Sequence, residues 1–374
     1  MKSITALLAT AATATAATAT NSSLPILAGI HTIYSYPSTA APPPELLELV
    51  RAGLVGGVIL FGENINASLT PPAMLALQDA YASSPAPALI ADLFGVEDAP
   101  LIIMTDQEGG RVKRIKEGGP ATSAKVAGQQ PDPEAAGHEA GSSAAETLKK
   151  YNHNGNLAPV LDVWQEPGNF IDEFERSYGN TSALVIEAGI AFVLGSQANG
   201  VAAAAKHFPG LGTAPQGANT DLVPVTLDVS EEELRRVHIP PFQAAVDAGV
   251  DMIMPSWAIY PALDAELPAG LSPVFIKGEL REGLGFKGVT VTDAIEAGSA
   301  MEAGGGDPGR TAVMAAQAGM DLLLSSARNV TQGAVVRKAL EQGVTSGQLD
   351  KAEFDAATER IVKLRAKLGA AARS

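Results

Sequence analysis

The chain has 374 residues, of which 46% are hydrophobic and 18% charged, a composition that excludes a disordered chain or a coiled coil. Its net charge is −15 and it has no dense basic stretch, so neither a nucleic acid nor an anionic membrane is an expected partner. The sequence contains no cysteine and no HxH or HxxxH pair, so disulfides, cysteine nucleophiles, a metal or another cofactor are not expected.

The first 19 residues have the pattern of a secretory signal peptide: a lysine at position 2, an Ala/Leu/Thr run, and Ala-Thr-Ala at 17–19. The alternative is a disordered Ala/Thr leader. Asn-x-Ser/Thr sequons at Asn21, Asn66, Asn180 and Asn329 are compatible with a secreted glycoprotein. No other stretch reaches the roughly 18 apolar residues that span a bilayer. We therefore expect a secreted protein whose folded part begins at residue 20.

After the leader, short apolar runs alternate with amphipathic segments. The pattern predicts buried parallel strands at 26–33, 57–61, 101–105, 157–163, 201–206, 250–255, 288–292 and 320–324. It predicts helices at 44–52, 72–82, 133–150, 182–198, 230–248, 274–283 and 310–318. This alternation favours a single-domain α/β fold, a (β/α)₈ TIM barrel over residues 20–374, with an open doubly wound sheet as the alternative. An apolar pattern over 346–368 predicts a final helix on the barrel wall.

Polar side chains stand where several of these strands end. Asp106 follows the third strand, Lys206 and His207 the fifth, and Asp293 the seventh. A lone Asp in such a place is often only a helix cap, but in a barrel all these ends meet at one mouth. Carboxylates beside cations suit a polyhydroxylated ligand. Trp257, after the sixth strand, could stack on a sugar ring or plug the rim.

A family resemblance becomes specific at these positions. The blocks TDQEGGRVKR (105–114), NLAPVLDV (156–163), RSYG (176–179), AKHFPG (205–210) and LGFKGVTVTD (284–293) resemble consecutive motifs of glycoside hydrolase family 3. The resemblance covers about residues 25–330 and is greatest to the single-domain β-N-acetylglucosaminidase branch. It implies a (β/α)₈ barrel that hydrolyses terminal β-linked sugars with retention of configuration. The resemblance to this branch implies that the sugar is N-acetylglucosamine.

The resemblance also implies roles for individual residues. Asp293 matches the nucleophile that forms a covalent glycosyl-enzyme intermediate. Five further residues match those that hold the sugar: Asp106, Arg114, Arg176, Lys206 and His207.

One segment departs from the family pattern. A retaining glycosidase needs a second group that protonates the leaving oxygen, and in this branch an Asp-His pair on the loop after KHFPG supplies it. Here that loop reads LGTAPQGANTD (211–221), with Thr220 where the histidine is expected. Asp221 could replace the histidine, or it could be an ordinary turn residue. A second explanation is that the protein has no acid and acts on substrates with good leaving groups, or catalyses another reaction through the same intermediate. A third is that it is a catalytically impaired carbohydrate-binding barrel.

Overall fold

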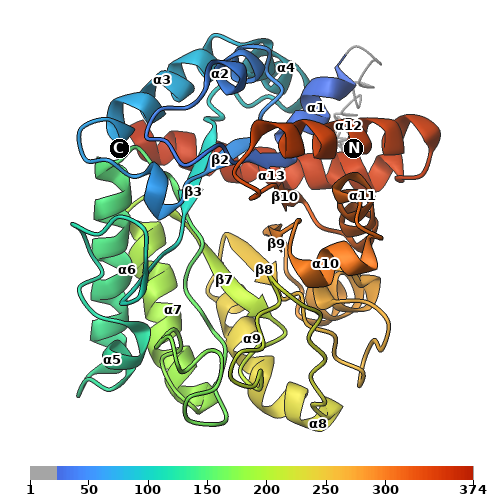
Figure 1. Ribbon diagram of the computed structural model, residues 1–374. Coiled ribbons are helices and arrows are strands. Elements are labelled where there is room, and N and C mark those ends of the chain that lie inside the picture. Colours follow the sequence, from blue (N-terminus) through green and yellow to red (C-terminus); the bar gives the residue numbers. More distant parts are fainter. Residues whose placement is uncertain (1–22, 374) are drawn as a thin grey trace, which may run out of the picture.

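Within residues 23–373, the part of the chain that the computed structural model describes, eight parallel strands close into a barrel (Figure 1). Their order around the barrel is β1-β10-β9-β8-β7-β6-β3-β2. The strands are β1 (Thr32–Tyr34), β2 (Gly57–Ile59), β3 (Ile102–Thr105), β6 (Gly155–Asn156), β7 (Ala202–Phe208), β8 (Met252–Pro255), β9 (Val289–Ala294) and β10 (Leu322–Leu324). The predicted (β/α)₈ barrel is therefore confirmed. The expected leader and the sequon at Asn21 lie outside the described residues.

The strand residues are buried on both faces, as the continuous apolar runs predict. Pairing is parallel throughout the barrel, for example Val58 with Ile103 and Ala205 with Ile253. Close approach of the strands requires a glycine at position 57, where a Cβ would stand 2.5 Å from the Ile102 carbonyl oxygen.

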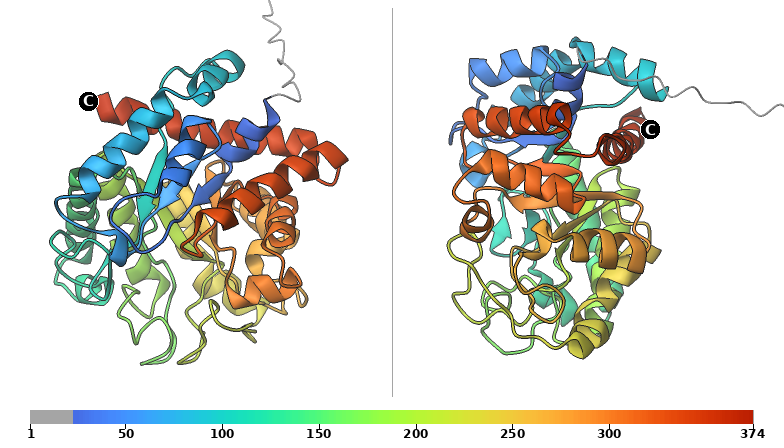
Figure 2. Two further views of the ribbon diagram at one scale, coloured as in Figure 1. Left: turned by 45° about the horizontal axis from the view of Figure 1, so that its top comes forward. Right: turned by 90° about the vertical axis from the view of Figure 1, so that its right-hand side faces the viewer.

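Helices form the outer layer around the strands (Figure 2). The main ones are α2 (Pro44–Arg51), α3 (Thr70–Ala82), α4 (Pro85–Phe94), α6 (Pro133–Lys150), α7 (Ser182–Ala198), α9 (Pro240–Asp247), the π-helix η4 (Val274–Gly283), α11 (Pro308–Ala318) and α12 (Val330–Ser346). Their starts follow local chemistry, since the side chains of Asp132, Thr181 and Asn329 cap α6, α7 and α12. Shorter elements are α1 (Leu24–Ile30), η1 (Gly62–Asn64), α5 (Ala124–Gly128), α8 (Glu231–Glu233), η2 (Leu234–His238), η3 (Ala269–Leu271) and α10 (Gly298–Ala303).

Three sequence expectations about these elements are wrong in detail. Residues 26–33 are mostly the helix α1, because an apolar run with a proline at its start fits a buried helix as well as a strand. The strand expected over 157–163 is reduced to β6, just before it, and a single parallel bridge between Val160 and Lys206, since Pro159 has no N–H to donate. The helix expected over 230–248 is divided into α8, η2 and α9, and Pro240 begins the last of them.

The final helix, α13 (Lys351–Arg373), is present but does not pack on the barrel wall as expected. It crosses the end of the barrel where the strands begin (Figure 2). Arg360 pairs with Asp321 before β10, Lys367 pairs with Asp251 before β8, and Arg365 donates to the Pro100 carbonyl before β3. These contacts close the N-terminal end and leave the opposite end for a site.

Candidate active site

A cavity of about 210 Å³ occupies the C-terminal mouth of the barrel. Lys206 and His207 are neighbours in β7, and both reach this cavity because the register with β8 shifts between Lys206 and Phe208. Asp293 reaches it from β9, and Asp221 from the loop after β7. The structure thus brings all the site residues expected from the sequence to one cavity: Asp106, Arg114, Arg176, Lys206, His207, Asp221 and Asp293.

Ion pairs connect five charged side chains at the base of the cavity. Lys206 Nζ lies 2.8 Å from Asp106 Oδ1 and 2.7 Å from Glu108 Oε1. Arg114 Nη2 donates to the other oxygen of Asp106 at 3.0 Å. Arg176 binds Glu108 with two hydrogen bonds, of 2.7 and 2.9 Å. The network holds three cations against two carboxylates, so each side chain has a fixed position before any ligand binds.

The network also sets the protonation of its members. Burial alone would raise the pKa of Asp106 and of Glu108, but the adjacent cations outweigh burial and hold both pKa values below their usual range. The same pairing raises the pKa of Lys206 and of Arg176 against the opposing effect of burial. All four groups therefore stay charged at neutral pH, and they can bind sugar hydroxyls without changing protonation.

Glu108 is a member of this network that the sequence reasoning missed. It lies on a two-stranded hairpin, β4 (Gln107–Gly109) and β5 (Val112–Lys113), immediately after β3. Its side chain is buried and does not line the cavity, so it orients Lys206 and Arg176 from behind. The available signal was a second carboxylate, two residues after Asp106, in the same sequence block.

Asp162 lies at the end of the fourth predicted strand and has no role assigned from the sequence, yet it fixes the ring of His207. Its Oδ2 lies 2.7 Å from His207 Nδ1, while Oδ1 accepts from the backbone N–H groups of His207 and Leu211. Arg176 Nη2 lies 3.4 Å from His207 Nε2. A ring that carries its proton on Nδ1 satisfies both contacts, since Nε2 can then accept. Burial opposes ionisation of Asp162, but His207 and the backbone donors hold its pKa low.

Asp293 lies near the end of β9, the seventh barrel strand, and hydrogen bonds fix the backbone around it. Its Oδ1 accepts from the Ala294 N–H at 2.7 Å, and the Ala294 carbonyl accepts from Trp257 Nε1 at 2.9 Å. Trp257 is fully buried, so of the two roles considered for it, stacking on a sugar is excluded. Its indole instead supports the backbone that carries Asp293.

The loop that carries Asp221 is attached to the segment after β9. The N–H groups of Gly298 and Ser299 donate to the carbonyls of Asp221 and Thr220, at 2.8 and 3.3 Å. The turn is made by the Asn219 side chain, which accepts from the Asp221 N–H at 2.9 Å. In the described part of the chain the Asp221 carboxylate makes no hydrogen bond. The residue is exposed at the cavity rim, and partial desolvation of its carboxylate together with the charge of Asp293 raises its pKa to about 6.

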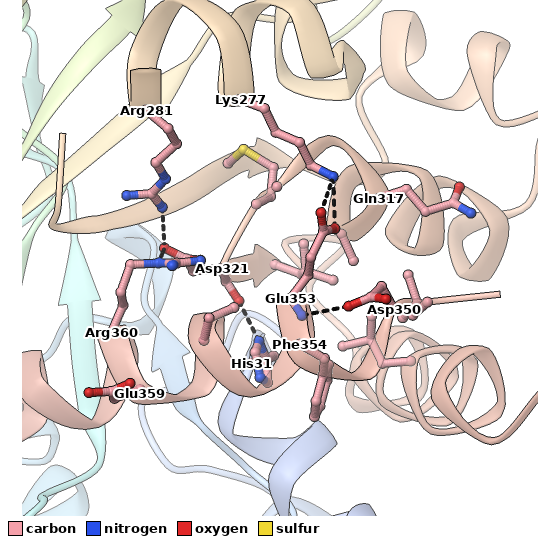
Figure 3. Close-up of a pocket in the computed structure, with 18 of the residues that line it drawn as sticks. His31, Lys277, Arg281, Gln317, Asp321, Asp350, Glu353, Phe354, Glu359 and Arg360 are labelled. Carbon is pink, nitrogen blue, oxygen red and sulfur yellow. Dashed lines mark hydrogen bonds and ion pairs between the residues drawn. The ribbon is translucent and has the colours of Figure 1, made fainter. Parts of the chain in front are cut away.

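A larger cavity, of about 810 Å³, lies at the other end of the barrel beneath α13 (Figure 3). Arg281 and Arg360 converge there on Asp321, with hydrogen bonds of 2.6 and 2.7 Å. His31 is occupied at both ring nitrogens, by the Asp321 carbonyl and the Thr358 hydroxyl. These groups already satisfy one another and attach α13 to the barrel, so the mouth at the C-terminal ends is the candidate active site.

Similar proteins are known over most of the chain. The model of the glycosyl hydrolase family 3 N-terminal domain matches residues 37–364. An uncharacterized secreted glycosyl hydrolase of Arthroderma benhamiae is 46% identical over 93% of this chain and 94% of its own length. A β-hexosaminidase of Thiobacillus denitrificans is 34% identical over 67% of this chain and 66% of its own.

Solved structures are similar over nearly the whole chain. The family 3 β-N-acetylglucosaminidase of Paenibacillus sp. superposes with a TM-score of 0.82 and 32% identity over 92% of this chain, which spans 62% of that longer protein. The β-N-acetylhexosaminidase of Beutenbergia cavernae gives 0.78 and 29% identity over 91% of this chain and 98% of its own. The chain therefore belongs to glycosyl hydrolase family 3 and is a glycoside hydrolase.

Proposed function

We propose that the protein removes terminal β-linked N-acetylglucosamine from glycosides with retention of configuration, through a covalent intermediate on Asp293, with Asp221 as the acid and base. The observation that carries this proposal is that both carboxylates line one cavity, and that the charge of Asp293 acts on Asp221. The choice of sugar is supported by the names of the similar Thiobacillus and Paenibacillus proteins.

In the first step, a carboxylate oxygen of Asp293 attacks the anomeric carbon. The bond from that carbon to the leaving oxygen breaks, and the proton of Asp221 moves to the leaving oxygen. In the second step, water attacks the same carbon, Asp221 takes a proton from the water, and the Asp293 carboxylate is released. Asp106 accepts hydrogen bonds from ring hydroxyls during both steps, while Lys206 donates them.

The coupling of the two carboxylates suits this alternation. Asp221 has its raised pKa, about 6, partly because Asp293 is negatively charged nearby. Once Asp293 has become an ester, that charge is gone and the pKa of Asp221 falls. Asp221 is therefore more fully ionised in the intermediate, and the second step needs it in this form, as a carboxylate base.

The second candidate is a sugar-binding barrel with impaired turnover. It is favoured by the residues at the rim of the cavity, because Thr220 stands in place of a histidine and Asp221 is exposed. General acid catalysis contributes typically about 10²- to 10⁴-fold, so its loss would leave binding intact while turnover becomes slow.

One experiment separates the two. An activated aryl β-N-acetylglucosaminide and N,N′-diacetylchitobiose are offered to the wild type and to Asp293→Ala, and the reaction is quenched for peptide mass spectrometry. We expect turnover by the wild type alone, and one N-acetylglucosaminyl group on the peptide that contains Asp293. A thermal shift with N-acetylglucosamine and no product from either substrate would favour the binding protein instead.

Secretion is part of the same proposal. The similar Arthroderma protein is described as secreted, and residues 1–19 have the signal-peptide pattern. No helix between residues 23 and 373 is long and apolar enough to cross a membrane. The sequon asparagines Asn66 and Asn180 are exposed, so a glycan could be attached at either. Analysis of the culture supernatant and the mature N-terminus tests this.

A further inference from the structure

We infer that the leaving-group side of this site prefers an apolar aglycone, an aryl or alkyl group, to a second sugar. The inference rests on the proposed function and adds to it the class of substrate. It comes from exposed hydrophobic side chains on the two loops whose other residues line the cavity.

Some of the large exposed hydrophobic side chains lie on loops at this mouth, close in sequence to residues that line the cavity. Eight such side chains occur in the described part of the chain, and three of them, Phe174, Leu222 and Val223, lie on the two loops that line the cavity. Leu222 is 74% exposed and Val223 is 51% exposed, and they directly follow Asp221. Single exposed apolar residues are ordinary, whereas a group of them beside a cavity marks a binding surface.

The opposite loop provides aromatic rings. Phe170 lines the cavity, and its ring packs edge-on against Phe174 with centroids 6.0 Å apart. Hydrogen bonds hold this loop to the loop that carries Asp221: the Phe170 N–H donates to the Ala214 carbonyl at 3.1 Å, and the Gln165 N–H to Gly212 at 3.0 Å. The rings and the aliphatic pair are therefore carried by two loops with a fixed relation to each other.

The aliphatic pair of this surface offers little to a sugar. The N–H groups of Leu222 and Val223 are already bonded to the Asn219 carbonyl, at 3.1 and 3.2 Å. Hydroxyl groups of a second sugar placed against these side chains would lose their water without gaining partners. An apolar aglycone would instead bury its own surface and that of the side chains.

The chemistry of the proposed acid points the same way. With a pKa near 6, Asp221 is mostly ionised at neutral pH and delivers its proton less readily than a fully protonated acid. A phenol leaves with less proton donation than a sugar hydroxyl, because its anion is more stable. Aryl glycosides thus match both the surface and the acid.

The test uses two aryl β-N-acetylglucosaminides whose phenols have the same pKa, one with an apolar substituent and one with a charged substituent, and N-acetylglucosaminyl fluoride as a substrate without an aglycone. We expect the wild type to prefer the apolar glycoside about tenfold in kcat/KM. The double variant Leu222→Ser/Val223→Ser should lose this preference and keep its rate on the fluoride. The matched control is Leu75→Ser, on α3, where the leucine is 52% exposed and does not line the cavity.

Each outcome has one meaning. A wild type with equal kcat/KM for the two glycosides overturns the inference, as does a preference that survives the double substitution. Turnover of the fluoride in either case leaves the proposed function standing. If none of the three substrates is turned over, the proposed function is refuted, and the aglycone inference with it.

Discussion

Replacing Asp221 by asparagine removes the proposed proton donor with almost no change in size. At a pKa of about 6, roughly nine tenths of Asp221 is protonated at pH 5 and about one tenth at pH 7. General acid catalysis by a protonated group is worth about 10²- to 10⁴-fold. We therefore expect Asp221→Asn to lower kcat/KM for N,N′-diacetylchitobiose by this full factor at pH 5, and by about ten times less at pH 7.

The pH profile is the assay that distinguishes chemistry from structure. Wild-type kcat/KM on the disaccharide should fall as pH rises through about 6, because the acid form of Asp221 is being lost, and the variant should lack this limb. Azide should partly restore turnover of an activated aryl substrate by Asp221→Asn, since azide attacks the intermediate without a base. The matched control, Asp228→Asn, changes an exposed aspartate further along the same segment.

The reasoning would be refuted by an Asp221→Asn protein that keeps both the wild-type rate and the descending limb. That result would place the acid on another residue.

Three further expectations concern stability and the far end of the barrel. Lys206→Met leaves Asp106 and Glu108 buried without their shared cation, so it should lower the free energy of unfolding in urea by about 3–5 kcal/mol, whereas the exposed Lys287→Met should change it by less than about 0.5 kcal/mol. Because the pKa values of both carboxylates are lower in the folded state, their stabilisation is present above about pH 4 and lost as pH falls further. Tm should therefore drop between about pH 4 and pH 2, and a flat Tm over this range would contradict the reasoning. Arg360→Met should speed hydrogen exchange in α13 and leave kcat unchanged, since it acts at the end opposite the site; lost activity with unchanged exchange would argue against it.

Much of the fold could be predicted because its signals are local. The apolar run at β7 and the amphipathic pattern of α6 each depend on residues within one element, so the alternation of the barrel can be read along the chain. The errors arise where the local signal is ambiguous. The run at 26–33 satisfies helix and strand equally, and only packing under α12 and α13 decides that most of it is the helix α1.

The candidate site was predictable where a strand end places a residue, as with Asp106, Lys206 and Asp293. Glu108 and Asp162 were missed because their part is to bind other side chains. Glu108 meets Arg176 across 68 residues, and Asp162 meets His207 across 45. No pattern within either segment carries those pairings.

The sequence by itself determined the class of fold, the family and the set of polar residues at the barrel mouth, since these follow from periodicity and from the order of motifs along the chain. Only the tertiary structure decided which carboxylates are held ionised by cations, which one is left unpaired at the rim, and that α13 closes the far end. The physical reason is that burial and Coulomb interaction depend on distances in space between residues far apart in the chain.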